Sequence, residues 1–321
     1  MERKPLIVIN ATAAKARRAW PTIKARLEQN KLTFDVYQTV APADATLRTR
    51  AALRAGVKTV AVVGGDGTLS EVAEGFFEFN NQTGGLPSVI NREATLAILP
   101  AGTGDDFARG LHGGRAPLDH WLERLISHGQ GKSASRVVDV MHGVCDNYTH
   151  EFICLNATTM GIGGETAQRV AAQGKFMRRF SGEARFAAAA IGALGAWRER
   201  RVRVSVDENE LIDDRMNLVA VANGRYAGGG MMLSPKARVD DGKLDVITAT
   251  GYSLAMVMRE LPRIHRGGHV ANPKVGITQG DSVRIETFAD EDALLIEADG
   301  NVRGKTPAEF RIMPGCLRFV A

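Results

Sequence analysis

The chain has 321 residues, of which 44% are hydrophobic and 24% charged, and this composition excludes a largely disordered or collagen-like protein. Lys and Arg number 41 against 36 Asp and Glu, so the formal net charge is +5. Such a small excess is compatible with phosphates or anionic lipid, but it does not indicate a nucleic-acid-binding protein. At roughly 150 residues per domain, the length predicts two domains.

Cysteine usage and the apolar segments predict a cytoplasmic protein without a membrane-spanning helix. The three cysteines, Cys145, Cys154 and Cys316, are odd in number and form no Cys-x-x-Cys pair, which argues against a disulfide framework and a cysteine-rich zinc site. The apolar run near the start, residues 6–9, is shorter than a secretory signal requires. The longest mostly apolar stretch, residues 186–197, is shorter than the roughly 20 residues that span a bilayer.

Strands and helices alternate along the first part of the chain. We expect strands at residues 6–10, 34–38, 57–63 and 95–99, and helices at 13–29, 43–55 and 68–80. Alternation with Val- and Ile-rich strands is typical of a parallel sheet covered on both faces. Residues 1–131 are therefore predicted to form an α/β nucleotide-binding domain, with ligands at the carboxyl ends of its strands.

Beyond residue 131 the sequence changes to β-type runs with helical insertions. We expect strands at residues 136–144, 152–158, 202–206, 217–222, 244–249, 282–287, 294–297 and 310–313, and helices near 165–173, 183–198 and 254–264. Residues 132–321 are thus predicted to form a mainly antiparallel β domain, with the return of the extreme C-terminus to the first domain left open.

The strongest chemical signal is Gly-Gly-Asp-Gly-Thr at residues 64–68, which follows a buried strand and precedes an amphipathic helix. Glycines let backbone N–H groups approach a ligand, and the helix N-terminus favours an anion. Asp66 could hold Mg²⁺ or orient a hydroxyl. The alternative is a tight turn in which Asp66 only caps a helix.

A second loop repeats this pattern one strand later. Residues 98–109 read Ile-Leu-Pro-Ala-Gly-Thr-Gly-Asp-Asp-Phe-Ala-Arg, again a strand, a Gly/Thr loop and a helix start. The chain has no Walker A loop, no Gly-x-Gly-x-x-Gly after a strand, and no protein-kinase His-Arg-Asp or Asp-Phe-Gly motif.

In order, the two loops resemble the diacylglycerol kinase catalytic domain, and the chain resembles the soluble bacterial lipid kinases, relatives of sphingosine and ceramide kinases. NAD kinases share the first loop, but the second loop resembles lipid kinases. Later landmarks of the resemblance are Asn156 with Gly161, glycines 228–230, the run at 240–246 and Asp299-Gly300.

The resemblance implies an ATP- and Mg²⁺-dependent lipid kinase that phosphorylates diacylglycerol to phosphatidate, with a ceramide or sphingoid-base kinase as the alternative. It implies nucleotide contacts at Thr39, Gly64, Gly65, Asp66, Gly67, Thr68, Leu69, Ser70 and Thr103. It also implies a Mg²⁺ site with the Asp241 carboxylate and the backbone carbonyls of Arg238 and Lys243, which suits a cation that prefers oxygen ligands. A plain hairpin turn is the other interpretation of that loop.

The sequence departs from the family pattern at three positions. Asp105 stands where the family usually has Asn, and Ser70 replaces a common Asn. Asn301 replaces the Glu of the family's Asp-Gly-Glu, a candidate general base, and Asn cannot accept a proton. Either Asp299 or Asp66 is then the catalytic base, or the protein is an inactive nucleotide- or lipid-binding regulator.

An arginine-rich segment at residues 169–203 surrounds the apolar run 186–197. Cationic flanks beside an apolar helix favour peripheral association with an anionic membrane surface, where the lipid substrate lies. A buried Ala-rich helix with solvated charged ends is the competing interpretation.

Overall fold

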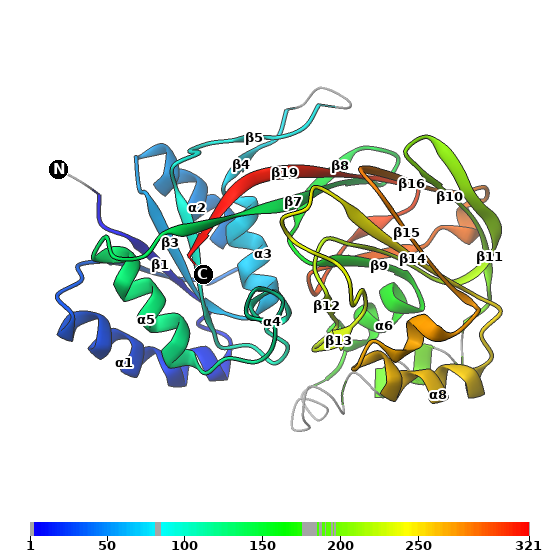
Figure 1. The fold of residues 1–321 in the computed structure, drawn as a ribbon, viewed down its shortest axis with the longest axis horizontal. Helices are drawn as coiled ribbons and strands as arrows, with labels where there is room; N and C mark the ends of the chain where they lie inside the picture. Colours follow the sequence, from blue (N-terminus) through cyan, green and yellow to red (C-terminus); the bar gives the residue numbers. More distant parts are fainter. Residues whose placement is uncertain are drawn as a thin grey trace. The chain divides into compact units, whose positions relative to one another are not determined.

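The computed structural model describes residues 3–80, 85–174 and 197–320, with isolated positions 185, 188–189, 191–193 and 195 between the last two ranges. The chain divides into two compact units (Figure 1). One unit contains the chain up to Val140 and from Met313 onward, and the other contains Met141–Ile312.

The first unit is an α/β domain with a parallel sheet, as predicted. Its strands are β1 (Leu6–Ile9), β2 (Asp35–Gln38), β3 (Thr59–Gly64), β6 (Thr95–Pro100) and the end of β19 (Ala308–Val320), with short β4 (Phe77–Glu78) and β5 (Ser88–Val89) paired apart. Its helices are α1 (Ala14–Gln29), α2 (Asp44–Arg54), α3 (Asp66–Glu74), α4 (Asp106–His112) and α5 (Leu118–Gly129). The parallel sheet has the order β19-β6-β3-β1-β2.

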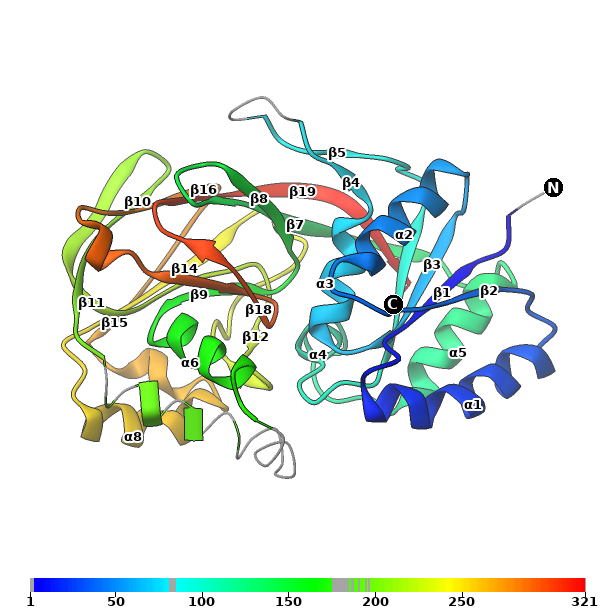
Figure 2. The ribbon, with the colours of Figure 1, turned by 180° about the vertical axis from the view of Figure 1, so that it is seen from behind.

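Helices cover both faces of this sheet, with α1 and α5 on one side and α2 and α3 on the other (Figures 1 and 2). This explains why strands such as β3, Thr-Val-Ala-Val-Val-Gly, are buried throughout rather than alternating between apolar and polar. The arrangement leaves the carboxyl ends of β3 and β6 to continue directly into the two glycine loops.

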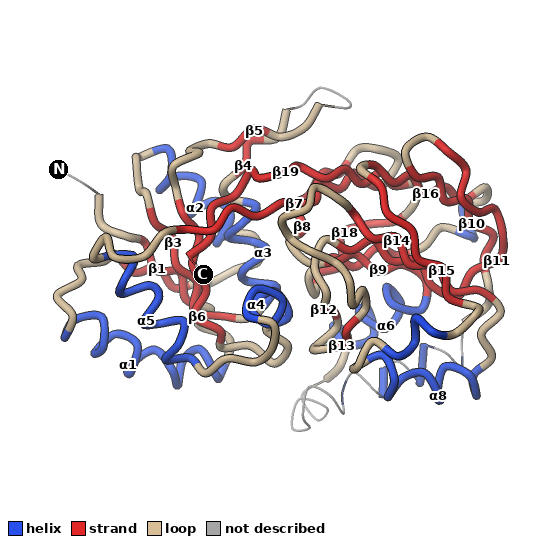
Figure 3. Tube along the Cα trace, in the orientation of Figure 1, coloured by secondary structure: helices blue, strands red, loops and turns tan. Residues whose placement is uncertain are grey.

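The second unit is mainly antiparallel β, also as predicted (Figure 3). Its strands are β7 (Ser135–Cys145), which enters from the first unit, β8 (His150–Cys154), β9 (Ala157–Gly161), β10 (Arg200–Val206), β11 (Asn209–Ala222), β12 (Tyr226–Ala227), β13 (Met231–Met232), β14 (Leu244–Thr250), β15 (Val275–Gly280), β16 (Ser282–Thr287), β17 (Leu295–Ala298) and β18 (Asn301–Lys305). Its helical elements are α6 (Ile162–Ala171), α8 (Leu254–Ile264), η2 (Gly268–Ala271) and η3 (Asp290–Asp292).

The long strand β11 organises this unit. Its first part pairs with β10, and its second part lies between β9 and β14. One core cluster, which includes Met160, Val219 and Ile296, packs on one face of these strands. A smaller cluster, built largely of alanines such as Ala157 and Ala220, packs on the other.

Two expected elements differ or fall outside the described residues. The single strand expected at 152–158 is two strands, β8 and β9, because the chain bends at Leu155 and Asn156, whose N–H groups bind the Asp299 carboxylate. The helix expected at 183–198 lies largely outside the described residues. Within the part of the chain that the structure describes, no helix is long and apolar enough to cross a membrane.

Candidate active site

The two glycine loops begin side by side in the first unit. Gly64, the last residue of β3, is the register partner of Pro100 on β6, and the N–H of Ala101 donates to the Gly64 carbonyl at 2.8 Å. Both loops then enter helices, α3 and α4. Two helix N-termini, each preferring an anion, therefore follow neighbouring strand ends.

The two loops are in close backbone contact at Gly65 and Gly102. A Cβ atom added to Gly102 would lie 2.6 Å from the Gly65 Cα, and one added to Gly65 would lie 3.0 Å from the Gly102 Cα. A side chain at Gly102 would meet the Gly65 backbone, which cannot turn away, and also the Asp105 carboxylate at 2.6 Å, so the two loops fit together only when this position is glycine.

Asp66 joins the two loops. Its Oδ1 accepts a hydrogen bond from the N–H of Phe107 at 3.1 Å, so this carboxylate caps α4 although it stands in the first turn of α3. Burial raises the pKa of the Asp66 carboxyl, and the N–H donors of α4 and the charge of Arg109 oppose that rise. The capping role foreseen from the sequence exists, but it acts across the two loops.

Asp105 adds a second carboxylate beside Asp66. It has a left-handed backbone, with φ of 51°, and its Oδ1 accepts from the N–H of Gly102 at 2.9 Å. Burial raises the pKa of Asp105 to about 6, and the neighbouring charge of Asp66 adds to the rise. The departure from Asn at this position therefore places two carboxyls where phosphates are expected.

Two basic side chains, Lys15 and Arg115, bind backbone carbonyls of the second loop. Lys15 Nζ donates to the carbonyl of Gly102 and Arg115 Nη2 to that of Thr103, each at 2.8 Å. They line a cavity of about 300 Å³, together with Ala19, Pro100, Ala101, Gly102, Asp105, Ala108, Arg109, Ala116 and Trp121. These contacts fix the direction of the loop carbonyls and hence of its N–H groups.

The end of β1 also reaches this site, which the sequence analysis missed. Asn10 Nδ2 donates to Thr68 Oγ1 at 2.8 Å, while Asn10 Oδ1 accepts from the N–H groups of Thr12 and Ala13. The N–H of Thr39 donates to the carbonyl of Ile9, so that predicted contact lies at the end of the neighbouring strand. The sequence signal for this residue was the position of Asn10 directly after the buried strand β1.

Not every predicted nucleotide contact presents a side chain. Leu69 is 1% exposed and Ser70 is 0% exposed, so both side chains lie inside the unit. Ser70, which replaces the family's common Asn, therefore packs in the core and does not present its hydroxyl to solvent.

Asp299 lies in the second unit, in the two-residue turn between β17 and β18. Asp299 and Gly300 both have positive φ, 47° and 87°, as a type I′ hairpin turn requires. The Asp299 oxygens accept from the N–H groups of Leu155, at 2.7 Å, and Asn156, at 2.9 Å. These bonds give Asp299 a structural position and weaken the case for it as a proton acceptor.

Two family models match this chain. Residues 4–141 match the diacylglycerol kinase catalytic domain, and residues 159–321 match the YegS C-terminal NAD kinase β-sandwich-like domain. The chain belongs to the diacylglycerol kinase family. It is a lipid kinase, and membership of a kinase family implies ATP as the phosphoryl donor.

Individual relatives are distant but cover nearly the whole chain. A diacylglycerol kinase from Staphylococcus carnosus is 26% identical over 97% of this chain and 92% of its own length, and one from Mycobacterium tuberculosis is 28% identical over 84% and 79%. A solved structure of a diacylglycerol kinase from Bacillus anthracis aligns over 99% of this chain and 96% of its own, with a TM-score of 0.67 and 20% identity. That likeness shows the shared fold.

The predicted metal loop of this lipid kinase lies between β13 and β14. Asp241 Oδ1 accepts from the N–H of Lys243 at 3.1 Å. Both basic side chains pair with carboxylates, Lys243 with Asp281 at 2.6 Å and Arg238 with Asp240 of the same loop at 3.2 Å. The loop therefore offers only oxygen donors, which fits Mg²⁺. No group of three or more His, Cys, Asp or Glu able to hold a metal occurs among the described residues.

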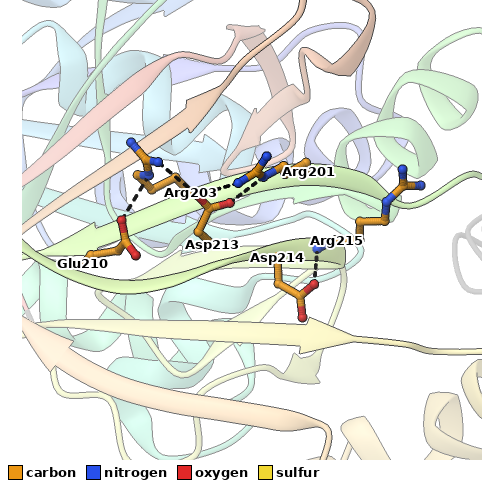
Figure 4. Close-up of polar contacts among 6 residues, drawn as sticks. All are labelled: Arg201, Arg203, Glu210, Asp213, Asp214 and Arg215. Carbon is orange, nitrogen blue, oxygen red and sulfur yellow. Dashed lines mark hydrogen bonds and ion pairs between the residues drawn. The ribbon is translucent and has the colours of Figure 1, made fainter.

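Several arginines of the predicted membrane segment are paired (Figure 4). Arg201 donates to both oxygens of Asp213, at 2.8 and 3.2 Å, and Arg203 Nη2 donates to the same carboxylate at 3.0 Å. Arg203 also pairs with Glu210 at 3.1 Å. Arg200 lies over the Trp197 ring and donates to the Ala293 carbonyl. Arg178 and Arg179 lie outside the described residues.

Proposed function

We propose that this protein transfers the γ-phosphoryl group of ATP to the free hydroxyl of diacylglycerol, giving phosphatidate and ADP. The observation that carries the proposal is the back-to-back contact of Gly65 and Gly102 at the ends of neighbouring parallel strands. The N–H groups of both loops and the N-termini of α3 and α4 lie at neighbouring strand ends, which supports a single anion-binding region. The names of the relatives support diacylglycerol as the acceptor.

The residues of the first unit bind and orient the nucleotide. Loop N–H groups and helix N-termini neutralise phosphate charge, and most of the catalysis of phosphoryl transfer comes from such positioning and charge stabilisation. Bound Mg²⁺ would supply further neutralisation, with Asp66 as a ligand near the phosphates. In the second unit the loop with Asp241 would hold a structural Mg²⁺ through oxygen donors.

A second candidate function rests on Asn301. Because an amide cannot accept the hydroxyl proton at the position of the family's Glu, the protein would on this view bind nucleotide or lipid without turnover. The two functions make opposite predictions for the wild-type protein.

The test is turnover of γ-labelled ATP with the purified chain and Mg²⁺. Diacylglycerol, ceramide and sphingosine are offered in mixed micelles, and NAD is offered in solution. Labelled phosphatidate as the main product supports the proposal, and label in ceramide or sphingosine instead supports the alternative substrate class. Absence of product with every acceptor, while ATP still binds, contradicts the kinase proposal and favours the regulator.

A further inference from the structure

The cavity of about 300 Å³ beside the second glycine loop lies wholly in the first unit. Helix α1 contributes Lys15 and Ala19 to its wall, and α5 contributes Trp121. The remaining wall comes from residues 100–109 and from the segment that joins α4 to α5. Its volume is at the lower end of the range for ligand cavities, so it suits a compact molecule.

Basic side chains outnumber acidic ones in the wall of this cavity. Lys15, Arg109 and Arg115 line it, and the opposing charge is the carboxyl of Asp105. Lys15 and Arg115 direct their hydrogen bonds to backbone carbonyls, which do not neutralise their charges. Arg109 Nε is buried and has no hydrogen-bond partner in the part of the chain that the structure describes. The cavity is therefore electropositive and attracts an anion.

The two side chains that hold the loop carbonyls keep donors for a ligand. A lysine ammonium and an arginine guanidinium each carry several N–H donors. In its 2.8 Å bond to the Gly102 carbonyl Lys15 uses one of them, and so does Arg115 in its 2.8 Å bond to the Thr103 carbonyl. An anion in the cavity can thus contact both side chains while the bonds that orient the loop persist.

This set of donors favours a phosphomonoester. At neutral pH such a group carries about two negative charges, together with several acceptor oxygens that match arginine N–H pairs. The Asp105 carboxylate repels any anion, so a singly charged carboxylate would gain less from the same cations. Ala19, Ala116 and Trp121 add apolar lining, which suits a short carbon skeleton attached to the phosphate.

The cavity is separate from the nucleotide contacts expected on the first loop. α1 and α5 cover one face of the parallel sheet, whereas α3, which follows the first loop, covers the other (Figures 1 and 2). Neither Thr39 nor any of residues 64–70 lines the cavity. The second loop connects the two regions, because Gly102 lines the cavity and also contacts Gly65.

We propose that this cavity is a binding site for a phosphomonoester, next to the nucleotide site but distinct from it. Lys15, Arg109 and Arg115 bind the phosphate oxygens, and the apolar lining contacts the carbon skeleton. The phosphomonoester is either a free small molecule or the headgroup of a lipid such as phosphatidate. The inference goes beyond the proposed function, because binding at this site needs no phosphoryl transfer.

The first test is calorimetric titration of the purified chain with glycerol 3-phosphate, with glycerol as the uncharged control. We expect one saturable site for glycerol 3-phosphate and no heat of binding for glycerol. The titration is repeated with a saturating, non-hydrolysable ATP analogue, and the probe should still bind. Loss of probe binding in proportion to the occupancy of the analogue would place the cavity within the nucleotide site and overturn the inference.

Variants then locate the site. Lys15→Gln and Arg115→Gln should each weaken probe binding about tenfold, because each removes a charge-assisted hydrogen bond. Arg17→Gln makes the same change at an exposed position of α1 outside the cavity, and should stay within about twofold of wild type. Asp105→Asn removes the repelling charge and should tighten binding by at least about threefold.

Ala116→Phe fills the cavity without changing any charge, so it should abolish probe binding. Thermal melting checks that each variant is folded. Equal weakening by Lys15→Gln and Arg17→Gln, or unchanged binding in a folded Ala116→Phe variant, would mean that surface charge alone attracts the probe and would overturn the inference.

Co-sedimentation with vesicles distinguishes the two sources of the phosphomonoester. Vesicles that contain phosphatidate are compared with vesicles that contain phosphatidylglycerol, whose phosphate is a diester. Binding of glycerol 3-phosphate assigns the site to a free small molecule. Retention on phosphatidate vesicles alone, lost in Ala116→Phe, assigns it to a lipid headgroup. Binding of neither probe overturns the inference and leaves the proposed function, which turnover of labelled ATP tests, unaffected.

Discussion

The Asp66 carboxylate on the first glycine loop caps the helix of the second loop through its 3.1 Å hydrogen bond from the Phe107 N–H. One side chain therefore serves two requirements: it holds α4 in place, and it brings negative charge to the expected phosphate region. Removing the side chain and removing only its charge should have different consequences.

We predict that Asp66→Ala and Asp66→Asn both lower turnover by about 100-fold or more, because both remove the carboxylate. Only Asp66→Ala also loses the cap, at a cost of about 1 kcal/mol, or a few degrees in Tm. Asp66→Asn keeps an oxygen acceptor and avoids burying a charge, so its Tm should stay at or above wild type. Wild-type turnover in either variant would remove Asp66 from the mechanism.

The contact between Gly65 and Gly102 predicts a large effect from one methyl group. Gly102→Ala places a Cβ atom 2.6 Å from the Gly65 Cα, so the loops must separate and ATP affinity should fall by at least about tenfold. Gly110→Ala, in the neighbouring α4, meets no atom within 4 Å and serves as the control. Calorimetric titration with ATP measures both; equal affinities would show that the loops do not bind the phosphates together.

The α/β unit was predictable because β1, β3 and β6 are continuous apolar runs separated by segments of helical periodicity, and the glycine loops follow β3 and β6 directly in the sequence. The capping of α4 by Asp66 was not predictable, because the sequence shows Asp66 only at the start of its own helix, α3. The same limit applies to Arg203 and Asp213, which become partners through the register of the β10–β11 hairpin.

In the second unit the sequence indicates the turn at Asp299, because Asp-Gly is a usual pair for a type I′ turn and here it follows the run Leu-Ile-Glu-Ala. The burial of Glu297, which is 8% exposed, was missed for a physical reason. In the run Leu-Ile-Glu-Ala a glutamate looks solvent-facing, and its burial depends on the packing of α6 against β17, which local sequence does not show.

Asp105 predicts a dependence of stability on pH. Its pKa is about 6 in the folded protein against the ordinary value of 3.8, so folding favours the protonated form. That stabilisation is fully present below about pH 4 and is lost as the pH rises through about 6. Asp105→Asn stays neutral at every pH and keeps the oxygen that accepts from Gly102, and Asn tolerates a left-handed backbone.

We therefore expect Asp105→Asn to raise the free energy of unfolding at pH 7.5 by on the order of 1–3 kcal/mol, and Tm with it. At pH 4 both should stay nearly unchanged. Thermal melting across pH 4–8 measures the difference between the variant and wild type. A constant difference over this range would mean that Asp105 does not titrate near pH 6.

Arginines that already pair with carboxylates should contribute little to binding an anionic membrane. Arg200 and Arg201 already pair with Glu165 and Asp213, so replacing both by Gln should weaken binding to phosphatidylglycerol vesicles by less than about twofold. The same change at Arg178 and Arg179 should weaken it by about 30-fold, since each cation near an anionic surface contributes roughly 1 kcal/mol. Co-sedimentation at low and high salt measures both pairs. Equal effects would contradict this assignment, and salt-independent binding would favour a buried helix.

Asp299 is either a structural residue of the hairpin turn or the catalytic base, and these two roles predict different outcomes for its variants. As a structural residue it accepts two backbone N–H groups, and Asp299→Asn turns one of its acceptors into a donor facing another donor. Losing a buried hydrogen bond to a charged group costs about 2 kcal/mol, so Tm should fall. The folded fraction should keep wild-type turnover and its pH dependence. Asp299→Gly, which relieves the backbone but removes both bonds, should be less stable still. A variant Asp299→Asn with unchanged Tm and a 100-fold loss of turnover would instead restore Asp299 as the catalytic base.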